Sequence, residues 1–182
     1  MNARTAMLLN ALSLYAIALV LGLGFVFQLA WDELPCPLCL LQRVAFIALA
    51  VGPILNLRYG PRPSHYAMSV LAALVGVMVS IRQVLLHILP GDPGYGSAIA
   101  GLHYYTWAAL IFTLAILLVA LVLLFDRQFE PALPPQVPAF AIIAVVLVIL
   151  VAAANIGSTF LECGTTWCPE NPVRYILLSG GG

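Results

Sequence analysis

The sequence predicts an all-α membrane protein, a helical bundle of about five transmembrane helices. Of its 182 residues, 63% are hydrophobic and 8% are charged, and the mean hydropathy is +1.07. A soluble domain carries about 25% charged residues, because its surface must face water. Most of this surface must therefore face lipid. The formal net charge is zero, and no basic stripe indicates a nucleic-acid partner.

The expected spans follow from the length of the apolar windows. A helix needs about 20 apolar residues to cross the hydrocarbon core. Five windows qualify, at residues 7–30, 39–57, 66–89, 104–125 and 137–157. Clusters of Pro, Gly and charged residues separate them, which is typical of helix ends. We expect residues 1–182 to form a single integral membrane domain that ends in an outer tail at 158–182.

The arginines predict the orientation of the spans. With a cytoplasmic N-terminus, the inner segments hold four of them, and the outer segments hold most of the acidic residues. This distribution agrees with the positive-inside rule, so we expect the N-terminus inside and the C-terminus outside. The inner arginines are Arg4, Arg58, Arg62 and Arg127. A cleaved signal peptide is the alternative for the first window, but its apolar stretch exceeds the usual length and no small-residue cleavage site ends it.

The first cysteine pair forms a Cys-x-x-Cys motif, Cys36-Pro37-Leu38-Cys39, at the start of the second window. A thiol in the first turn of a helix meets the positive end of the helix dipole, which favours the thiolate. Arg43 follows Cys39 at i+4 and shares its helix face. Its guanidinium is therefore the candidate partner for a thiolate or for a reduced, anionic acceptor.

The second pair, Cys163 and Cys168, follows the fifth window on a polar segment that we expect to move. An odd number of spans places both pairs on one outer, oxidising side. Four cysteines allow three pairings, and we expect 36–39 and 163–168 at rest with a transient bond between the pairs. Structural disulfides, an all-cysteine zinc site and unreactive thiols are the alternatives. Small rings stabilise little, and an oxidising compartment disfavours zinc.

Two further residues of the third window are candidates for a ligand site. Arg82 lies within the apolar stretch, and His87 lies nearer its outer end. A charge at such depth usually faces a partner or a cavity. With Arg43, these side chains would line one pocket suited to a planar carbonyl acceptor, although Arg82 could instead snorkel or pair with Asp92 and His87 could be a satisfied interfacial residue.

The motif from Pro35 to Arg43, with its Cys-x-x-Cys and Gln-Arg, resembles the disulfide-bond formation protein B family of bacterial inner-membrane thiol:quinone oxidoreductases. The stretch from Arg82 to Pro90 is similar to the third span of that family. The resemblance implies a four-helix core, here with one extra span. It also implies a quinone acceptor (ubiquinone or menaquinone) beside Cys39 and Arg43, with assistance from His87.

The resemblance further implies a partner, a periplasmic thioredoxin-like dithiol oxidase that is reoxidised through Cys163 and Cys168. The usual family pattern has its second pair between spans three and four. Here that loop, residues 90–103, lacks cysteine, and the pair follows the fifth span. Chain order favours Cys163 as the sulfur that meets the partner. The rival functions are a membrane thiol reductase, for which no cysteine relay lies within the spans, and a non-catalytic scaffold braced by disulfides.

Overall fold

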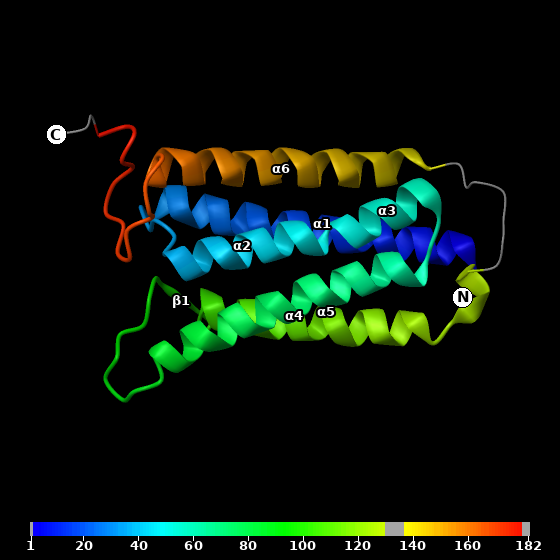
Figure 1. Ribbon diagram of the computed structural model, residues 1–182, viewed down its shortest axis with the longest axis horizontal. Helices are drawn as coiled ribbons and strands as arrows, with labels where there is room; N and C mark the ends of the chain where they lie inside the picture. Colours follow the sequence, from blue (N-terminus) through cyan, green and yellow to red (C-terminus); the bar gives the residue numbers. More distant parts are fainter. Residues whose placement is uncertain (1, 130–136, 180–182) are drawn as a thin grey trace.

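The fold is a bundle of long helices, which a computed structural model describes for residues 2–129 and 137–179 (Figure 1). Residues 130–136, between the predicted fourth and fifth spans, and residues 180–182 of the predicted tail lie outside the described residues. The helices are α1 Ala3–Ala30, α2 Pro37–Leu49, α3 Val51–Tyr59, α4 Pro63–Leu86, α5 Tyr104–Leu123 and α6 Ala139–Cys163. Two short strands, β1 Ala98–Ile99 and β2 Leu102–His103, pair antiparallel, and a 3-10 turn, η1, covers Asp126–Phe129.

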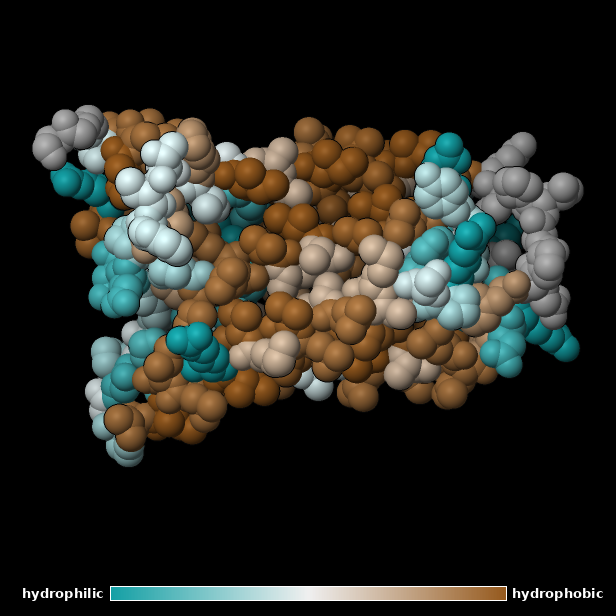
Figure 2. Space-filling model, in the orientation of Figure 1, coloured by the Kyte–Doolittle hydropathy of each residue, from teal (hydrophilic) through white to brown (hydrophobic). Residues whose placement is uncertain are grey.

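The prediction of a helical membrane protein with about five spans is confirmed. Within the described residues, five helical segments are long and apolar enough to cross a membrane, and α2 and α3 together form one of them, Pro37–Tyr59. Figure 2 shows the expected surface, with hydrophobic side chains over the middle of the bundle and hydrophilic ones gathered at its two ends.

The helices lie side by side, and the contacts run from α6 to α1, from α1 to α3, from α2 and α3 to α4, and from α4 to α5. The start of α2 and the end of α6 lie at the same end of the bundle (Figure 1), which we call the cysteine end. The start of α1 and the turn from α3 to α4 lie at the other end, the opposite end. Both cysteine pairs therefore share one end, as an odd number of spans requires.

The second span is interrupted at Ala50, between α2 and α3. Pro53 has no backbone N–H, so it cannot donate to the carbonyl of Leu49 four residues earlier. That carbonyl accepts instead from the hydroxyl of Ser69 on α4, at 3.3 Å. The two helices approach closely here, because a Cβ at Gly52 would overlap Ser69 and the backbone of His65. The proline therefore bends the span without leaving a buried carbonyl unpaired.

The last helix is longer than the sequence predicts. α6 continues to Cys163, so the tail begins at Gly164 rather than at residue 158. The helix ends there because Gly164 has φ 62°, a left-handed conformation that favours glycine. Cys163 thus belongs to the last turn of a helix, and the expectation that it lies beyond the fifth span is wrong.

A buried polar cluster joins α1, α3, α4 and η1 at the opposite end. The Asn56 amide donates to Asn10 Oδ1 at 2.9 Å, and Asn56 Oδ1 lies 2.9 Å from His65 Nδ1. The Asn10 amide donates to the Tyr66 hydroxyl, which donates in turn to Gln128 Oε1 at 3.0 Å. We call these five residues the opposite-end cluster. Their side chains hydrogen-bond to one another and so tie the helices together.

Candidate active site

The first disulfide, between Cys36 and Cys39, lies at the N-terminus of α2. Cys36 is the N-cap residue, and its sulfur accepts a hydrogen bond from the backbone N–H of Cys39 at 3.2 Å. Pro37 occupies the first helical turn, where its missing N–H costs nothing. Both sulfurs therefore meet the positive end of the helix dipole, as the sequence predicts. Cys36 is buried and Cys39 is half-buried.

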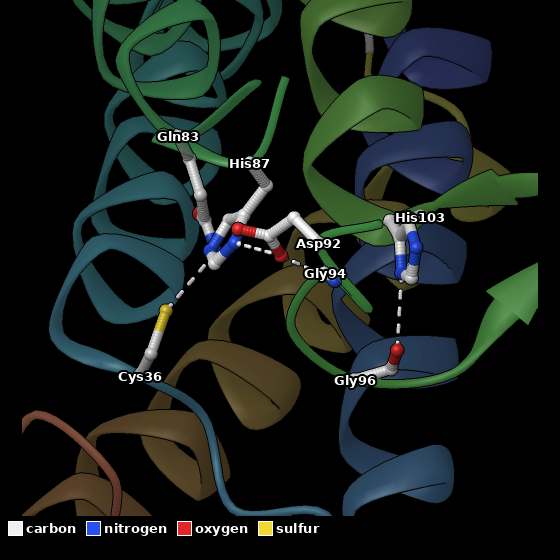
Figure 3. Close-up of polar contacts among 7 residues, drawn as sticks. All are labelled: Cys36, Gln83, His87, Asp92, Gly94, Gly96 and His103. Carbon is white, nitrogen blue, oxygen red and sulfur yellow. Dashed lines mark hydrogen bonds and ion pairs between the residues drawn. The ribbon is translucent and has the colours of Figure 1, made fainter. Parts of the chain in front are cut away.

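Gln83 of α4 contacts both sulfurs of this disulfide. Its amide nitrogen lies 3.2 Å from Cys36 Sγ and 3.5 Å from Cys39 Sγ, and Figure 3 shows the contact with Cys36. The amide of Gln42 donates to Gln83 Oε1 at 2.8 Å, which orients Gln83. A donor that is aimed at a sulfur stabilises the thiolate that forms when the disulfide opens.

A cavity of about 300 Å³ adjoins Cys39. It lies between α1, α2 and α5, and the loops at the cysteine end cover it. Its walls are mostly apolar and aromatic, and its polar groups lie near the disulfide. The aromatic lining residues are Phe27, Phe46, Tyr95, Tyr104 and Trp107, and the polar ones include Gln28, Glu33, Gln42 and Arg43.

Arg43 is held on the cavity wall by three hydrogen bonds. Its Nη1 donates to Gln28 Oε1 at 2.7 Å and to Asn155 Oδ1 at 3.0 Å, and its Nη2 donates to the carbonyl of Gly24 at 3.0 Å. A guanidinium has five N–H donors. Two therefore remain without a partner among residues 2–129 and 137–179, and they can bind a ligand oxygen in the cavity.

Arg82 and His87 are not among the residues that line this cavity with Arg43. Arg82 is exposed. The ring of His87 pairs with Asp92 at 3.0 Å (Figure 3) and stacks on Tyr105. Asp92 therefore pairs with His87, whereas the sequence suggested Arg82 as its alternative partner. Through these contacts, His87 holds the loop that follows α4 in place.

That loop covers the cavity and is fastened to the connection between α1 and α2. The hydroxyl and the backbone N–H of Ser97 both donate to the carboxylate of Glu33, and the Tyr95 hydroxyl donates to the carbonyl of Leu34 at 2.6 Å. Burial above all, together with the negative charge of Glu33, raises the pKa of Tyr95 to about 12. Tyr95 is therefore a hydrogen-bond donor at any physiological pH.

The second disulfide, between Cys163 and Cys168, closes a short ring at the end of α6. Cys163 is buried, with 4% of its surface exposed, whereas Cys168 is half-buried beside the exposed Trp167. The tail returns to the helix, because the N–H of Ile176 donates to the carbonyl of Glu162 at 3.2 Å. This ring and the first disulfide occupy the same end of the bundle, as the sequence predicts.

Several residues of the site were not predicted from the sequence, above all Gln83 and Asn155. A signal for Gln83 exists. The buried residues of α4 recur at intervals of three or four and include Gln83 but not Arg82, as the series Ser69, Ala73, Gly76, Ser80 and Gln83 shows. Small and polar residues at this spacing mark the packed face of a membrane helix. No comparable signal indicates that Asn155 of α6 meets Arg43.

The cavity lining suits a flat ring that carries carbonyl oxygens. Its aromatic walls suit a flat ring, and the spare donors of Arg43 suit a carbonyl oxygen. The hydroxyl of Tyr104, a further lining residue, is buried beside the carboxylate of Glu33, which can accept its hydrogen bond.

The fold and the site define a class, a multi-pass membrane protein with two disulfides and an apolar cavity at one end. A family model described as "Disulfide bond formation protein DsbB" matches residues 4–98, more than half of the chain. The chain therefore belongs to the DsbB family, which confirms the resemblance noted in the sequence. The match includes Cys36, Cys39 and Arg43 and ends before α5, α6 and the second disulfide.

Curated relatives named "Disulfide bond formation protein B" agree with this assignment. One from Xanthomonas axonopodis pv. citri is 38% identical over 86 residues, which are 44% of this chain and 50% of the relative. One from Aromatoleum aromaticum is 36% identical over 86 residues, 44% of this chain and 52% of the relative. The aligned part thus spans about half the length of the curated relatives it matches. No solved structure matches the chain.

Proposed function

We propose that this protein is a thiol:quinone oxidoreductase that reoxidises a thioredoxin-like dithiol protein and passes the electrons to a membrane quinone, ubiquinone or menaquinone. One observation carries the proposal. Cys39, one sulfur of the helix-capping disulfide, lines an apolar cavity together with Arg43, whose spare N–H donors can bind a carbonyl oxygen. The second disulfide at the same end supplies a route for electrons into the first.

Electrons enter through Cys168 in this proposal, not through Cys163 as chain order favours. Cys168 is the more exposed sulfur of the pair. A partner thiolate attacks Cys168 and forms a mixed disulfide, and Cys163 leaves as a thiolate. The second thiol of the partner then loses its proton and attacks its own mixed-disulfide sulfur. This releases the oxidised partner and leaves Cys163 and Cys168 as a reduced pair, which has gained two electrons.

The reduced pair passes its electrons to the first disulfide by the same chemistry. The thiolate of Cys163 attacks Cys36, and Cys39 leaves as a thiolate next to the cavity. Attack of Cys168 on Cys163 then restores the 163–168 disulfide and leaves Cys36 and Cys39 reduced. The helix N-terminus and the amide of Gln83 stabilise the Cys39 thiolate. A bound quinone would supply the final two-electron acceptor, and Arg43 would hold one of its oxygens.

We place the protein in the bacterial inner membrane, with the cysteine end at the periplasm. The four arginines predicted to lie inside, Arg4, Arg58, Arg62 and Arg127, belong to the segments at the opposite end. Acidic residues prevail at the cysteine end, where Arg174 of the tail is the exception. This asymmetry supports a cytoplasmic N-terminus and a periplasmic C-terminus. A membrane-impermeant thiol reagent tests it, because after mild reduction it should label Cys168 from the periplasmic side alone.

An assay with purified protein tests the function. A reduced thioredoxin-like protein and ubiquinone are added, and quinone absorbance is followed. The wild-type protein should reduce the quinone, and Cys39→Ser should not. If the two are indistinguishable and neither turns over, the disulfides are structural and the protein is a scaffold. If added quinol instead reduces the partner's disulfide, the protein is a thiol reductase.

A further inference from the structure

A buried carboxyl group lies at the end of α6, immediately before Cys163. Glu162 has 0% of its surface exposed, and neither of its carboxyl oxygens has a hydrogen-bond partner among the described residues. An ionised carboxylate in such a place would lack both water and hydrogen bonds, which is strongly unfavourable. A carboxylic acid that keeps its proton avoids most of this cost. The disulfide exchange described above makes no use of this group.

The face of α6 that carries Glu162 is directed toward the cavity wall. Asn155, Ser158 and Glu162 recur at intervals of three and four, so they share one face of the helix. Asn155 Oδ1 accepts from Arg43 Nη1 at 3.0 Å, and Ser158 Oγ accepts from Gln28 Nε2 at 2.8 Å. Glu162 lies one turn beyond Ser158, toward the cysteine end.

The titratable groups near Glu162 come from three other parts of the chain. Arg43 of α2 interacts with it electrostatically, and so does Tyr95 of the loop after α4. Tyr175 of the tail interacts with Arg43 and accepts a hydrogen bond from Gln28 at 2.8 Å. Helix α1 contributes the neutral amide of Gln28, which bonds Ser158 and Tyr175. Arg43 and Tyr95 both line the cavity. Glu162 therefore lies near the cavity wall, and it directly precedes Cys163 in the chain.

We infer that Glu162 relays protons: its protonated carboxyl group gives its proton toward the cavity, where a bound quinone would take it up, and regains a proton released by thiol oxidation at the cysteine end. This inference rests on the proposed function. Oxidation of a dithiol to a disulfide releases two electrons and two protons, and reduction of a quinone to a quinol takes up two of each. Glu162 carries one of these protons on a carboxyl oxygen and is unchanged after each turnover.

The first test compares Glu162→Gln with Glu170→Gln, a matched change of an exposed acid in the tail. Glutamine keeps the size of Glu162 but cannot carry the proton. We expect kcat for quinone reduction to fall on the order of 100-fold, as for the loss of a proton-transfer group, with KM for quinone unchanged. Glu170→Gln should match the wild type. In Glu162→Ala, formate should restore part of kcat, because a small acid can occupy the vacated space.

A second test does not depend on turnover. Infrared spectra of the purified wild-type protein at neutral pH should contain the C=O band of a protonated carboxylic acid. Glu162→Gln should lack that band, and Glu170→Gln should keep it. This comparison still decides whether Glu162 holds a proton if the wild type proves unable to reduce a quinone, the result that refutes the proposed function.

Three results would overturn the inference. The first is that Glu162→Gln has the same kcat for quinone reduction, and the same dependence of kcat on pH, as the wild type. The second is a change in KM alone, which would make Glu162 a counter-charge for Arg43. The third is a wild-type infrared spectrum in which no band depends on Glu162. The melting temperature of each variant in detergent shows whether it folds. If Glu162→Gln does not fold, a wild-type spectrum without any band of a protonated carboxylic acid would still overturn the inference.

Discussion

The two ends of the bundle each contain a buried polar cluster, and the clusters differ in how completely their hydrogen bonds are satisfied. At the opposite end, Asn10, Asn56, His65, Tyr66 and Gln128 hydrogen-bond to one another. At the cysteine end, Arg43 keeps spare donors and Glu162 has no hydrogen-bond partner among the described residues. A satisfied network holds helices together, whereas unsatisfied groups beside a cavity can bind and react.

The largest effect that tests this comparison is expected at Arg43. Arg43→Ala should raise KM for quinone about 10- to 100-fold, because a hydrogen bond from a charged group contributes roughly 1.5–3 kcal/mol. Steady-state quinone reduction measures it. The control is Arg82→Ala, which removes an exposed arginine that does not line the cavity. Equal effects of the two variants would contradict the cavity as the quinone site.

At the opposite end, a variant should lower stability and leave turnover unchanged. Asn56→Ala removes a side chain that bonds Asn10, His65 and the backbone N–H of Arg62. We expect the free energy of unfolding to fall by about 1–3 kcal/mol, because buried partners are left unsatisfied. Denaturation in detergent measures it, and KM for quinone should stay at the wild-type value. A changed KM would mean that the two ends are coupled.

A smaller loss of stability is expected for Tyr66→Phe, which removes one hydroxyl from the same cluster. That hydroxyl accepts from Asn10 and donates to Gln128. Hydrogen bonds between membrane helices contribute about 0.6 kcal/mol on average, so the unfolding free energy should fall by roughly 1 kcal/mol. The same denaturation experiment measures it, with Tyr59→Phe, an exposed tyrosine, as the control. No difference between the two variants would contradict a stabilising role for the cluster.

The smallest effect concerns the loop that covers the cavity. The backbone N–H of Gly94 and the side chain of His87 hold the pKa of Asp92 below its ordinary value. A lowered pKa means that ionised Asp92 stabilises the folded loop above the unfolded-state pKa. This contribution is lost as the pH falls through the lowered pKa. The protection factor of the Gly94 amide, its intrinsic exchange rate divided by its observed rate at the same pH, should therefore fall at acid pH, and Asp92→Asn should show the lower protection already at neutral pH. An unchanged protection factor in Asp92→Asn would show that ionised Asp92 does not stabilise this loop.

Much of the fold could be predicted from composition, because the outside of each span must be apolar where it faces lipid. The apolar windows located five spans, but their ends shifted. The bend at Ala50 depends on Pro53 and on the Ser69 hydroxyl that satisfies the freed carbonyl of Leu49. At the end of α6, the returning tail contacts the last helical turn, where the N–H of Ile176 donates to the carbonyl of Glu162. Hydropathy records neither contact.

The site could be predicted where its residues are neighbours in sequence. Cys36, Cys39 and Arg43 lie within two turns of one helix, so spacing alone places them together. Arg82 and Gln83 are adjacent, and residue type alone favours the charged one as a site residue. The rotation of α4 in the bundle turns Gln83 toward the disulfide and Arg82 outward. The choice between them depends on helix packing, not on residue type.

The sequence by itself determined a membrane bundle with two cysteine pairs at one end and an arginine one turn after Cys39, because span length, span parity and helical spacing are local properties. Only the tertiary structure decided which polar groups meet. It brought Asn155 and Glu162 of α6 to Arg43 and directed Gln83 at the sulfurs. It also left Cys168 more exposed than Cys163. These relations join residues that are distant in sequence, and the packing of helices against one another sets them.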